Sequence, residues 1–282
     1  MFRATTMAMG VILSFGASVD AFATIINYAD FTSTAGLQLN GNAATATDSS
    51  SRNVLRVTPS TFGQSGSAFS TSAVTLGADV SFSTKFSFNF NQQLNGGADG
   101  LVFVVQTVSN TSGGAGGGIG YAGLPNSVGV EFDNWNNGGI DGNSENHAGI
   151  DLNGDVNSVA LNTSLPFLLD SGIDLFSWID YNGVTDLLEV RLSNVNIRPV
   201  SSLLSYVVDL AAVLGTPNAF VGFTSGTGAA GANHDVISWE FRDTFAPVDV
   251  PPRDPNNVPE PMSLLLIGGG LVGMAATRRR IR

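Results

Sequence analysis

The stretch from Val80 to Phe90 alternates between apolar and polar side chains with a period of two residues. Val80, Phe82, Phe86, Phe88 and Phe90 share one parity, while serine and lysine side chains occupy much of the other. A helix would spread these apolar residues around its circumference, whereas a half-buried strand keeps them on one face. The stretch therefore predicts a long β-strand with one face in a hydrophobic core.

Shorter runs of the same kind follow, separated by clusters of glycine, asparagine, aspartate and serine. The expected strands are 101–106, 128–132, 176–181, 187–192, 220–223 and 236–241. Asn182-Gly183 predicts a hairpin turn between two of them, because this pair tolerates positive φ. Only residues 201–214 have a pattern compatible with a short helix. Since no linker interrupts residues 24–245, we expect a single all-β domain, an antiparallel β-sandwich.

The composition narrows the possible chemistry. The chain has no cysteine, which excludes a disulfide scaffold and a thiolate metal site. Its 12 basic and 23 acidic side chains give a formal net charge of −11. Such a surface repels phosphate backbones, so nucleic acid is not an expected partner. Dense carboxylates suit hard cations better.

The N-terminal residues 1–23 have the pattern of a secretory signal peptide. Arg3 supplies positive charge, Met7 to Phe15 form a short apolar run, and Ala21-Phe22-Ala23 fits a small-x-small cleavage site. The alternative is a buried helix of the mature protein.

The C-terminal end has three successive parts. Residues 246–257 are rich in proline and predict an extended linker. Residues 258–282 hold Pro259-Glu260-Pro261, an apolar run from Met262 to Ala276 and a basic end. This run is short for a full membrane span of about 20 residues.

The tail resembles the PEP-CTERM sorting signal of exopolysaccharide-producing Gram-negative bacteria. The resemblance implies export, transient membrane anchoring and processing near the motif by a membrane exosortase, which would release or anchor the domain outside the cell. The alternative is an ordinary C-terminal membrane anchor.

The segment from Val130 to Asp151 is chemically the densest part of the chain. Glu131 and Asp133 lie two residues apart at the end of an expected strand, so their side chains emerge on one face. A loop with Asn137 and Asp141 follows, and His147 opens the next expected strand. Carboxylate and amide oxygens are calcium ligands, and an added imidazole suits a transition metal such as manganese. A solvated loop is the alternative.

This segment resembles the metal loop of the legume-type (L-type) lectins. Further segments are similar to that family in the same order, and together they cover essentially all of residues 24–245: 26–31, 66–69, 98–100, 116–120, 178–181, 188–190, 220–224 and 234–241. The resemblance implies a concanavalin-like jelly-roll β-sandwich that binds carbohydrate.

By that resemblance, Glu131 and His147 would hold Mn²⁺ or another transition metal. Asp133 and Asp141 would bridge this ion to Ca²⁺, which would also take Asn137 and the backbone carbonyl of Trp135.

The resemblance also implies a sugar site. Asp99 would accept hydrogen bonds from two sugar hydroxyls, aimed by a cis Ala98–Asp99 peptide. Gly117 would offer its backbone N–H, Asn137 its amide, and Trp135 a stacking surface. The loop Gly228-Ala229-Ala230 would close the site through backbone contacts.

The chain departs from the family pattern at one place. The interval from Asp141 to His147 is one residue longer than usual, and it contains Asn143 and Glu145. Either residue could replace Asp141 as a ligand, or the transition-metal half could be lost. Calcium is therefore the firmer expectation.

The pattern argues against an enzyme. Glycoside hydrolases with this architecture carry E-x-D-x-x-E on one strand face, and Asn136 stands where the third carboxylate belongs. His234 is expected to be a structural hydrogen-bonding residue. We expect an exported lectin that recognises a polysaccharide or glycoconjugate. The alternatives are a matrix protein with a weak sugar site, or adhesion and homodimer formation through sheet edges.

Overall fold

The alternating stretch forms the longest strand of the computed structural model, β7 (Phe82–Leu94). The expected phenylalanines on it, Phe82, Phe86, Phe88 and Phe90, are buried. Val80 is also buried but lies in a turn before the strand, with a φ of 59°. The strand thus begins two residues later than the alternation and continues four residues beyond Phe90.

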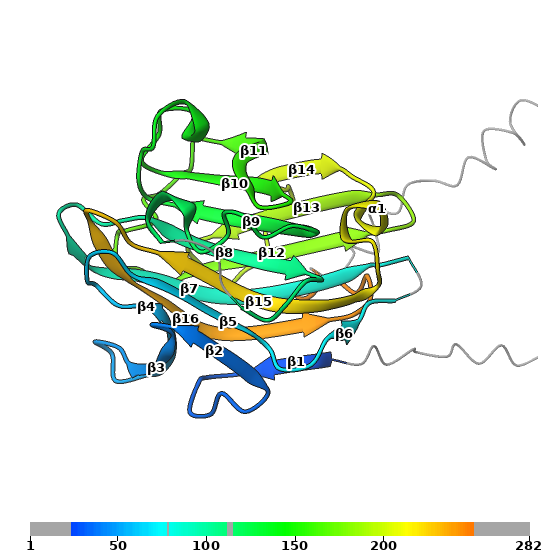
Figure 1. The fold of residues 1–282 in the computed structure, drawn as a ribbon, viewed down its shortest axis with the longest axis horizontal. Helices are drawn as coiled ribbons and strands as arrows, with labels where there is room; N and C mark the ends of the chain where they lie inside the picture. The colour runs from blue at the N-terminus through cyan, green and yellow to red at the C-terminus, as the bar shows by residue number, and fades with distance from the viewer. Residues whose placement is uncertain (1–23, 78, 112–114, 251–282) are drawn as a thin grey trace, which may run out of the picture. The chain divides into compact units, whose positions relative to one another are not determined.

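The structure describes residues 24–77, 79–111 and 115–250, which form two antiparallel sheets packed face to face (Figure 1). The first sheet has the order β14 (Leu204–Val207), β13 (Leu187–Ser193), β12 (Leu175–Asn182), β7, β16 (Gly231–Arg242), β4 (Asn53–Thr58) and β3 (Ala44–Thr47), with β1 (Thr24–Tyr28) paired to β16.

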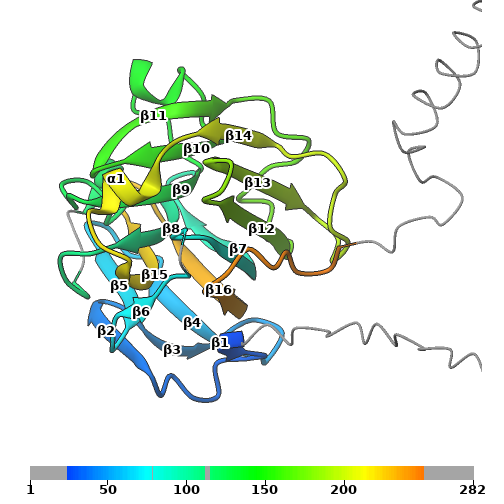
Figure 2. The same cartoon turned by 90° about the vertical axis from the view of Figure 1, so that its right-hand side faces the viewer.

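The second sheet has the order β11 (Asp155–Asn162), β10 (His147–Leu152), β9 (Ser127–Asp133), β8 (Gly100–Gln106), β15 (Asn218–Gly226), β5 (Ser65–Ser70) and β2 (Leu37–Gly41), with β6 (Val74–Thr75) paired to β15. At one edge of the sandwich β11 and β14 lie next to each other (Figure 2). All the strands predicted from the sequence are present, and the jelly-roll sandwich is confirmed.

Aromatic rings from both sheets fill the core. Phe86 and Phe88 of the first sheet meet Phe223 and Phe132 of the second, with ring centroids 5.0 and 4.9 Å apart. Trp239 packs edge-on against Phe223 at 4.9 Å. Buried aromatic pairs of this kind add specific geometry to the hydrophobic burial. They hold the two sheets in one register.

The predicted hairpin joins β12 to β13, but its glycine serves a different purpose from the one expected. The residue with positive φ in the connection is Asp186, at 55°, and not Asn182 or Gly183. A Cβ on Gly183 would lie 1.6 Å from the carbonyl oxygen of Asp79. Gly183 is therefore required by the close approach of another chain segment.

The segment 201–214 is helical only at its end. β14 occupies its middle, and α1 covers Leu210–Leu214. Asp209 caps this helix by accepting a hydrogen bond from the Ala212 N–H. Two further short helices, η1 (Gly116–Gly118) and η2 (Gly139–Asp141), lie in the loops of the candidate site.

The chain continues along the first sheet after β16. Ala246 and Val248 are buried, the Ala246 N–H donates to Ser83 Oγ at 3.0 Å, and Arg198 donates to the Val248 carbonyl. The first residues of the expected linker thus pack on the sandwich.

The expected signal peptide, the sorting motif and the apolar run Met262–Ala276 lie outside the described residues. Within residues 24–77, 79–111 and 115–250, no helix is long and apolar enough to cross a membrane.

Replacing Gly183 by alanine should destabilise the domain by about 2 kcal/mol, because the new methyl group would collide with the Asp79 backbone. Urea unfolding measures this change. Val184→Ala in the same turn is the control, since the Val184 side chain is 76% exposed and should change the free energy of unfolding by less than about 0.5 kcal/mol. Equal stabilities of the two variants would contradict this account of the turn.

Candidate functional site

Three strands of the second sheet bring the predicted site residues together at one end of the sandwich. Gly100 of β8 pairs with Asp133 of β9 and with Gly226 of β15. The residues adjoining these positions therefore meet: Asp99 before β8, the loop after β9 and the loop 227–230 after β15. This end lies on the left of Figure 1, away from α1.

Glu131, Asp133 and His147 form the tightest group of potential metal ligands. One ligand atom from each lies within 4.8 Å of the others, and all three side chains are buried. His147 Nε2 lies 3.5 Å from Glu131 Oε1, and neither ring nitrogen has a hydrogen-bond partner among the described residues. Buried nitrogen atoms without partners are costly, so a bound ion would satisfy this group. Two carboxylates with one imidazole fit a transition metal.

Asp141, in the loop after β9, is not part of this tight group but interacts electrostatically with Glu131 and His147. Its carboxylate accepts a hydrogen bond from the Asn137 N–H, and burial together with the negative charge of Glu131 raises its pKa. Burial and the charge of Glu131 likewise raise the pKa of Asp133, and the charge of Asp141 raises it further. Asp133, Asp141 and Asn137 thus offer the oxygen atoms that Ca²⁺ prefers.

The longer interval before His147 left Asp141, Asn143 and Glu145 as alternative ligands, and which of them completes the site stays a prediction. Glu145 lies near Asp170, whose pKa is raised first by burial and then by the charge of Glu145. The Asn146 amide donates to the Phe167 carbonyl and accepts from the Leu169 N–H, both at 2.9 Å. The longer loop between Asp141 and His147 is therefore hydrogen-bonded through Asn146 to residues 167 and 169. Of the four residues expected to hold the transition metal, Glu131, Asp133 and His147 lie together.

Asp99 is held tightly through its backbone. The Ala98–Asp99 peptide is cis, as the resemblance implies. The Asp99 N–H donates to the Gly226 carbonyl at 3.0 Å, and the Asp99 carbonyl accepts from the Asn134 N–H at 2.9 Å. Its side chain is 2% exposed, and Oδ2 has no hydrogen-bond partner among the described residues. Burial and the charge of Asp141 raise the Asp99 pKa to about 6.

The other predicted sugar contacts surround Asp99 and the metal loop. A Cβ on Gly117 would lie 2.6 Å from Asn137 Nδ2, and one on Gly228 would lie 3.4 Å from Asp99 Oδ2. A side chain at position 117 would therefore force Asn137 to move, whereas a Cβ at position 228 would make only an ordinary van der Waals contact with Asp99. Ala229 is exposed, whereas Ala230 is buried and accepts the Gly228 N–H with its carbonyl.

Trp135 is half-buried, and its N–H donates to Asp133 Oδ1 at 2.7 Å. Its backbone is therefore anchored beside the group of carboxylates. The metal and sugar roles assigned to these residues stay predictions.

Asn134 is a site residue that the sequence reasoning missed. Besides its backbone bond to Asp99, its side chain is buried with both amide atoms unpartnered among the described residues, and Nδ2 lies close to Gly97. Asn134 directly follows the potential ligand Asp133. It therefore joins the metal loop to the Asp99 loop. Its position after the carboxylate was the only signal available in the sequence.

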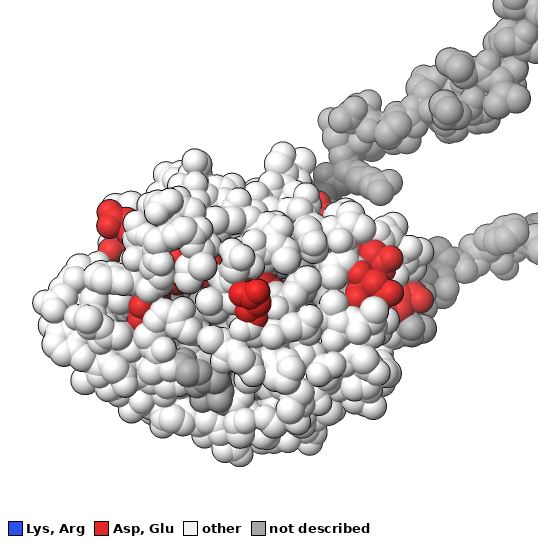
Figure 3. Space-filling model, turned by 45° about the horizontal axis from the view of Figure 1, so that its top comes forward, with Lys and Arg blue, Asp and Glu red and all other residues white. Residues whose placement is uncertain are grey.

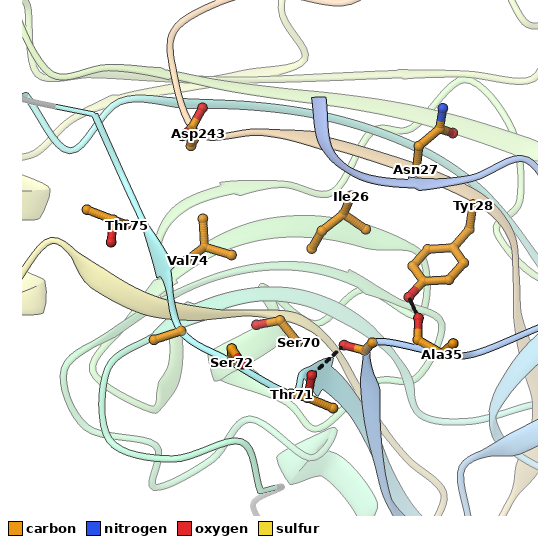
Figure 4. A pocket seen from close by; sticks show the side chains of 12 residues that line it. Ile26, Asn27, Tyr28, Ala35, Ser70, Thr71, Ser72, Val74, Thr75 and Asp243 are labelled. Carbon is orange, nitrogen blue, oxygen red and sulfur yellow. Dashed lines mark hydrogen bonds between the residues drawn. The ribbon is translucent and has the colours of Figure 1, made fainter. Parts of the chain in front are cut away.

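A separate pocket of about 650 Å³ lies among residues of β1, β5 and β6 and contains none of the predicted site residues (Figure 4). Ile26, Tyr28 and Val74 form part of its walls. Its Tyr28 and Thr71 hydroxyls donate to the carbonyls of Ala35 and Gly36. The two hydroxyl groups therefore already have hydrogen-bond partners within the protein.

Calcium should stabilise the domain more at neutral than at acid pH. Raised carboxyl pKa values favour the protonated folded state, so the stability they contribute is complete below about pH 4 and is lost as the pH rises through about 6. Calcium binds the ionised form and offsets that loss. Scanning calorimetry in calcium and in chelator should show a larger difference in Tm at about pH 7.5 than at about pH 5. A difference that is independent of pH would contradict this assignment.

Asp141→Asn should weaken calcium binding by about tenfold or more, because it removes a ligand charge. Glu145→Gln is the matched control, since Glu145 lies toward Asp170 and should leave the calcium affinity within about twofold. Calorimetric titration with calcium measures both. A larger loss in Glu145→Gln would show that the longer loop has changed its ligand.

Comparison with known proteins bears on both parts of the chain. A model of the legume lectin domain matches residues 23–256, and a model of the PEP-CTERM protein-sorting motif matches residues 257–280. The L-type lectin-domain containing receptor kinase VIII.1 of Arabidopsis thaliana is 35% identical over 201 residues, which are 68% of this chain and 26% of the kinase. The chain thus spans about a quarter of the length of that relative.

The basic agglutinin of Psophocarpus tetragonolobus is 36% identical over 182 residues, which are 59% of this chain and 71% of the agglutinin. Among solved structures, lectin II from Ulex europaeus has a TM-score of 0.64 and 26% identity, covering 78% of this chain and 99% of that one. The basic winged bean lectin with Tn-antigen has a TM-score of 0.62 and 29% identity, covering 77% and 96%. The chain belongs to the legume lectin domain family, a family of non-enzymatic carbohydrate-binding proteins, and carries a PEP-CTERM sorting motif.

Proposed function

We propose that this chain is an exported, calcium-dependent lectin whose sugar site is centred on Asp99. The observation that carries the proposal is the buried Asp99 carboxylate with one oxygen unpartnered among the described residues. It lies where the metal loop, the Gly117 segment and the 227–230 loop converge. A buried acceptor without a partner is costly, and two sugar hydroxyls would supply the missing donors.

Metal binding would act on Asp99 through one short connection. Asp133, a proposed ligand of both ions, is followed by Asn134, whose N–H holds the Asp99 carbonyl. Burial, and after it the charges of neighbouring carboxylates, raise the pKa values of Asp133 and Asp141. Ions bound by Glu131, Asp133, Asp141 and His147 would offset both effects. Calcium would thereby fix the loop from which Asp99 reaches its ligand, with Asn137 and the Trp135 carbonyl completing its ligand set. Mn²⁺ or another transition metal would occupy the Glu131–His147 half.

Charge favours a neutral glycan as the ligand. The face shown in Figure 3 displays acidic groups scattered among neutral ones, and no basic side chain of the described residues is visible on it. With a formal net charge of −11, the protein repels polyanions, including nucleic acids. Neutral polysaccharides carry no such penalty. A homodimer stays a prediction.

The sorting motif supports a location outside the cytoplasm. Residues 257–280 match it, and the expected signal peptide at residues 1–23 would start export. An exosortase would process the tail, leaving the lectin domain at the surface of a Gram-negative cell or in its matrix. We propose the cell's extracellular polysaccharide as the ligand.

Asp99→Ala should abolish glycan binding, because it removes the central acceptor while leaving the backbone contacts of residue 99 in place. A glycan array that includes galactose and GalNAc measures the loss. These two sugars are chosen because structures of a Bauhinia forficata lectin with GalNAc and of lectin UEA-II with galactose share this fold.

Asp79→Ala provides the matched control, since Asp79 is an exposed aspartate that is not among the predicted site residues. It should bind like the unchanged protein, and both variants should keep the far-UV circular dichroism spectrum. Undiminished binding by Asp99→Ala would place the sugar site elsewhere.

A further inference from the structure

A chain of three buried hydrogen bonds connects the first sheet to the residue after Asp99. His234 Nδ1 of β16 lies 2.8 Å from Thr58 Oγ1 of β4, and Thr58 Oγ1 lies 2.7 Å from Ser225 Oγ of β15. Ser225 Oγ in turn donates to the Gly100 carbonyl of β8 at 2.7 Å. The His234, Thr58 and Ser225 side chains are fully buried. These hydrogen bonds therefore connect the two sheets through the core, at the end of the sandwich where Asp99 lies.

The direction of every hydrogen bond in this chain follows from its last acceptor. The Gly100 carbonyl can only accept, so the single Ser225 proton goes to it. Ser225 Oγ must then accept the Thr58 proton, and Thr58 Oγ1 must accept a proton from His234 Nδ1. His234 is thus fixed as the neutral tautomer with its proton on Nδ1.

The surroundings of His234 agree with a neutral ring. Its Nε2 has no hydrogen-bond partner among the described residues, and its ring packs edge-on against Phe90 with centroids 4.5 Å apart. Burial lowers the His234 pKa to about 3. The ring therefore acts as a fixed donor and not as a group that titrates near neutral pH.

This series of hydrogen bonds adds to the backbone contacts that hold Asp99. The peptide groups on either side of Asp99 are bound by the Gly226 carbonyl and by the Asn134 N–H. The Gly100 carbonyl, in the following peptide group, accepts the hydrogen bond of the Ser225 hydroxyl. Thr58 and His234 orient that hydroxyl, and hydrogen bonds in such a chain strengthen one another.

We propose that Thr58 and His234 are positioning residues for Asp99. Their side-chain hydrogen bonds, among the described residues, join them to each other and to Ser225, and they act by fixing the Ser225 hydroxyl on the Gly100 carbonyl. The consequence for sugar affinity rests on the proposed function. The effect on the Asp99 backbone does not, so the two are measured separately.

Thr58→Val tests the proposal, because it keeps the shape of the side chain and removes the central hydroxyl. Thr84→Val is the matched control, because Thr84 is also buried and its hydroxyl also joins two hydrogen bonds, to the Glu240 carbonyl and from Trp239 Nε1. Thr84 pairs with Ile179 and Phe241 within the first sheet. Thr58→Ser restores the hydroxyl. Amide hydrogen exchange of Asp99 and Asn134 is followed by NMR on the whole protein in calcium.

Thr58→Val should speed exchange at Asp99 and Asn134 by about tenfold relative to Thr84→Val, and Thr58→Ser should reverse the effect. The ¹⁵N shifts of His234 should show the Nδ1–H tautomer in the unchanged protein and in Thr58→Ser. Affinity for GalNAc, if it binds, should fall by about tenfold in Thr58→Val with calcium affinity unchanged.

Equal exchange rates in Thr58→Val and Thr84→Val, or an Nε2–H tautomer in the unchanged protein, would overturn the proposal. Loss of calcium binding in Thr58→Val alone would also overturn it, because the effect would then be on the metal loop. Failure of the unchanged protein to bind any glycan would count against the proposed function and leave the exchange result as the test of positioning.

Discussion

Buried carboxyl groups lie close together at one end of the second sheet, and the site depends on how their burial and mutual repulsion are offset. Asp99, Asp133 and Asp141 have raised pKa values, and Glu131 contributes to two of these shifts. Among the described residues, none of these groups forms a salt bridge with lysine or arginine. The one ion-pair partner of Glu131 in this part of the chain is His147, whose Nε2 lies 3.5 Å from Glu131 Oε1. A fold with a large aromatic core can tolerate this arrangement, but ionised groups at this density need cations to become favourable.

The sandwich concentrates that charge because strand ends meet there. Gly100 pairs with both Asp133 and Gly226, so the loops that adjoin these three positions lie close together although they are far apart in the sequence. Asn134 and the Ser225 hydroxyl then fix the backbone on either side of Asp99. The proposed metal loop and the proposed sugar site are thus joined by hydrogen bonds at one end of the domain.

The sequence was sufficient to predict the sandwich and the strands β7, β8, β9, β12, β13, β15 and β16, but not β2, β3, β4, β5, β11 or β14. Alternation located β7, and the ordered motifs placed Asp99, Gly117 and the metal loop together. Local patterns failed where distant segments decide the structure. Gly183 is required by Asp79 rather than by its own φ. The expected hydrogen-bonding role of His234 is confirmed, but its partner Thr58 lies on a strand far away in sequence and was not predicted. The outcome of the longer interval before His147 depends on how Asn146 is tied to residues 167 and 169.

We propose a surface lectin whose neutral ligand would be held by an acidic site that calcium organises and whose tail would direct export. Cations would make this acidic site competent to bind sugar. The most direct measurement is a glycan array probed with the unchanged protein in calcium and again in chelator. The account predicts binding to a set of neutral glycans in calcium and its loss in chelator, with recovery when calcium is restored. Equal binding in both conditions, or no binding to any glycan in calcium, would contradict it.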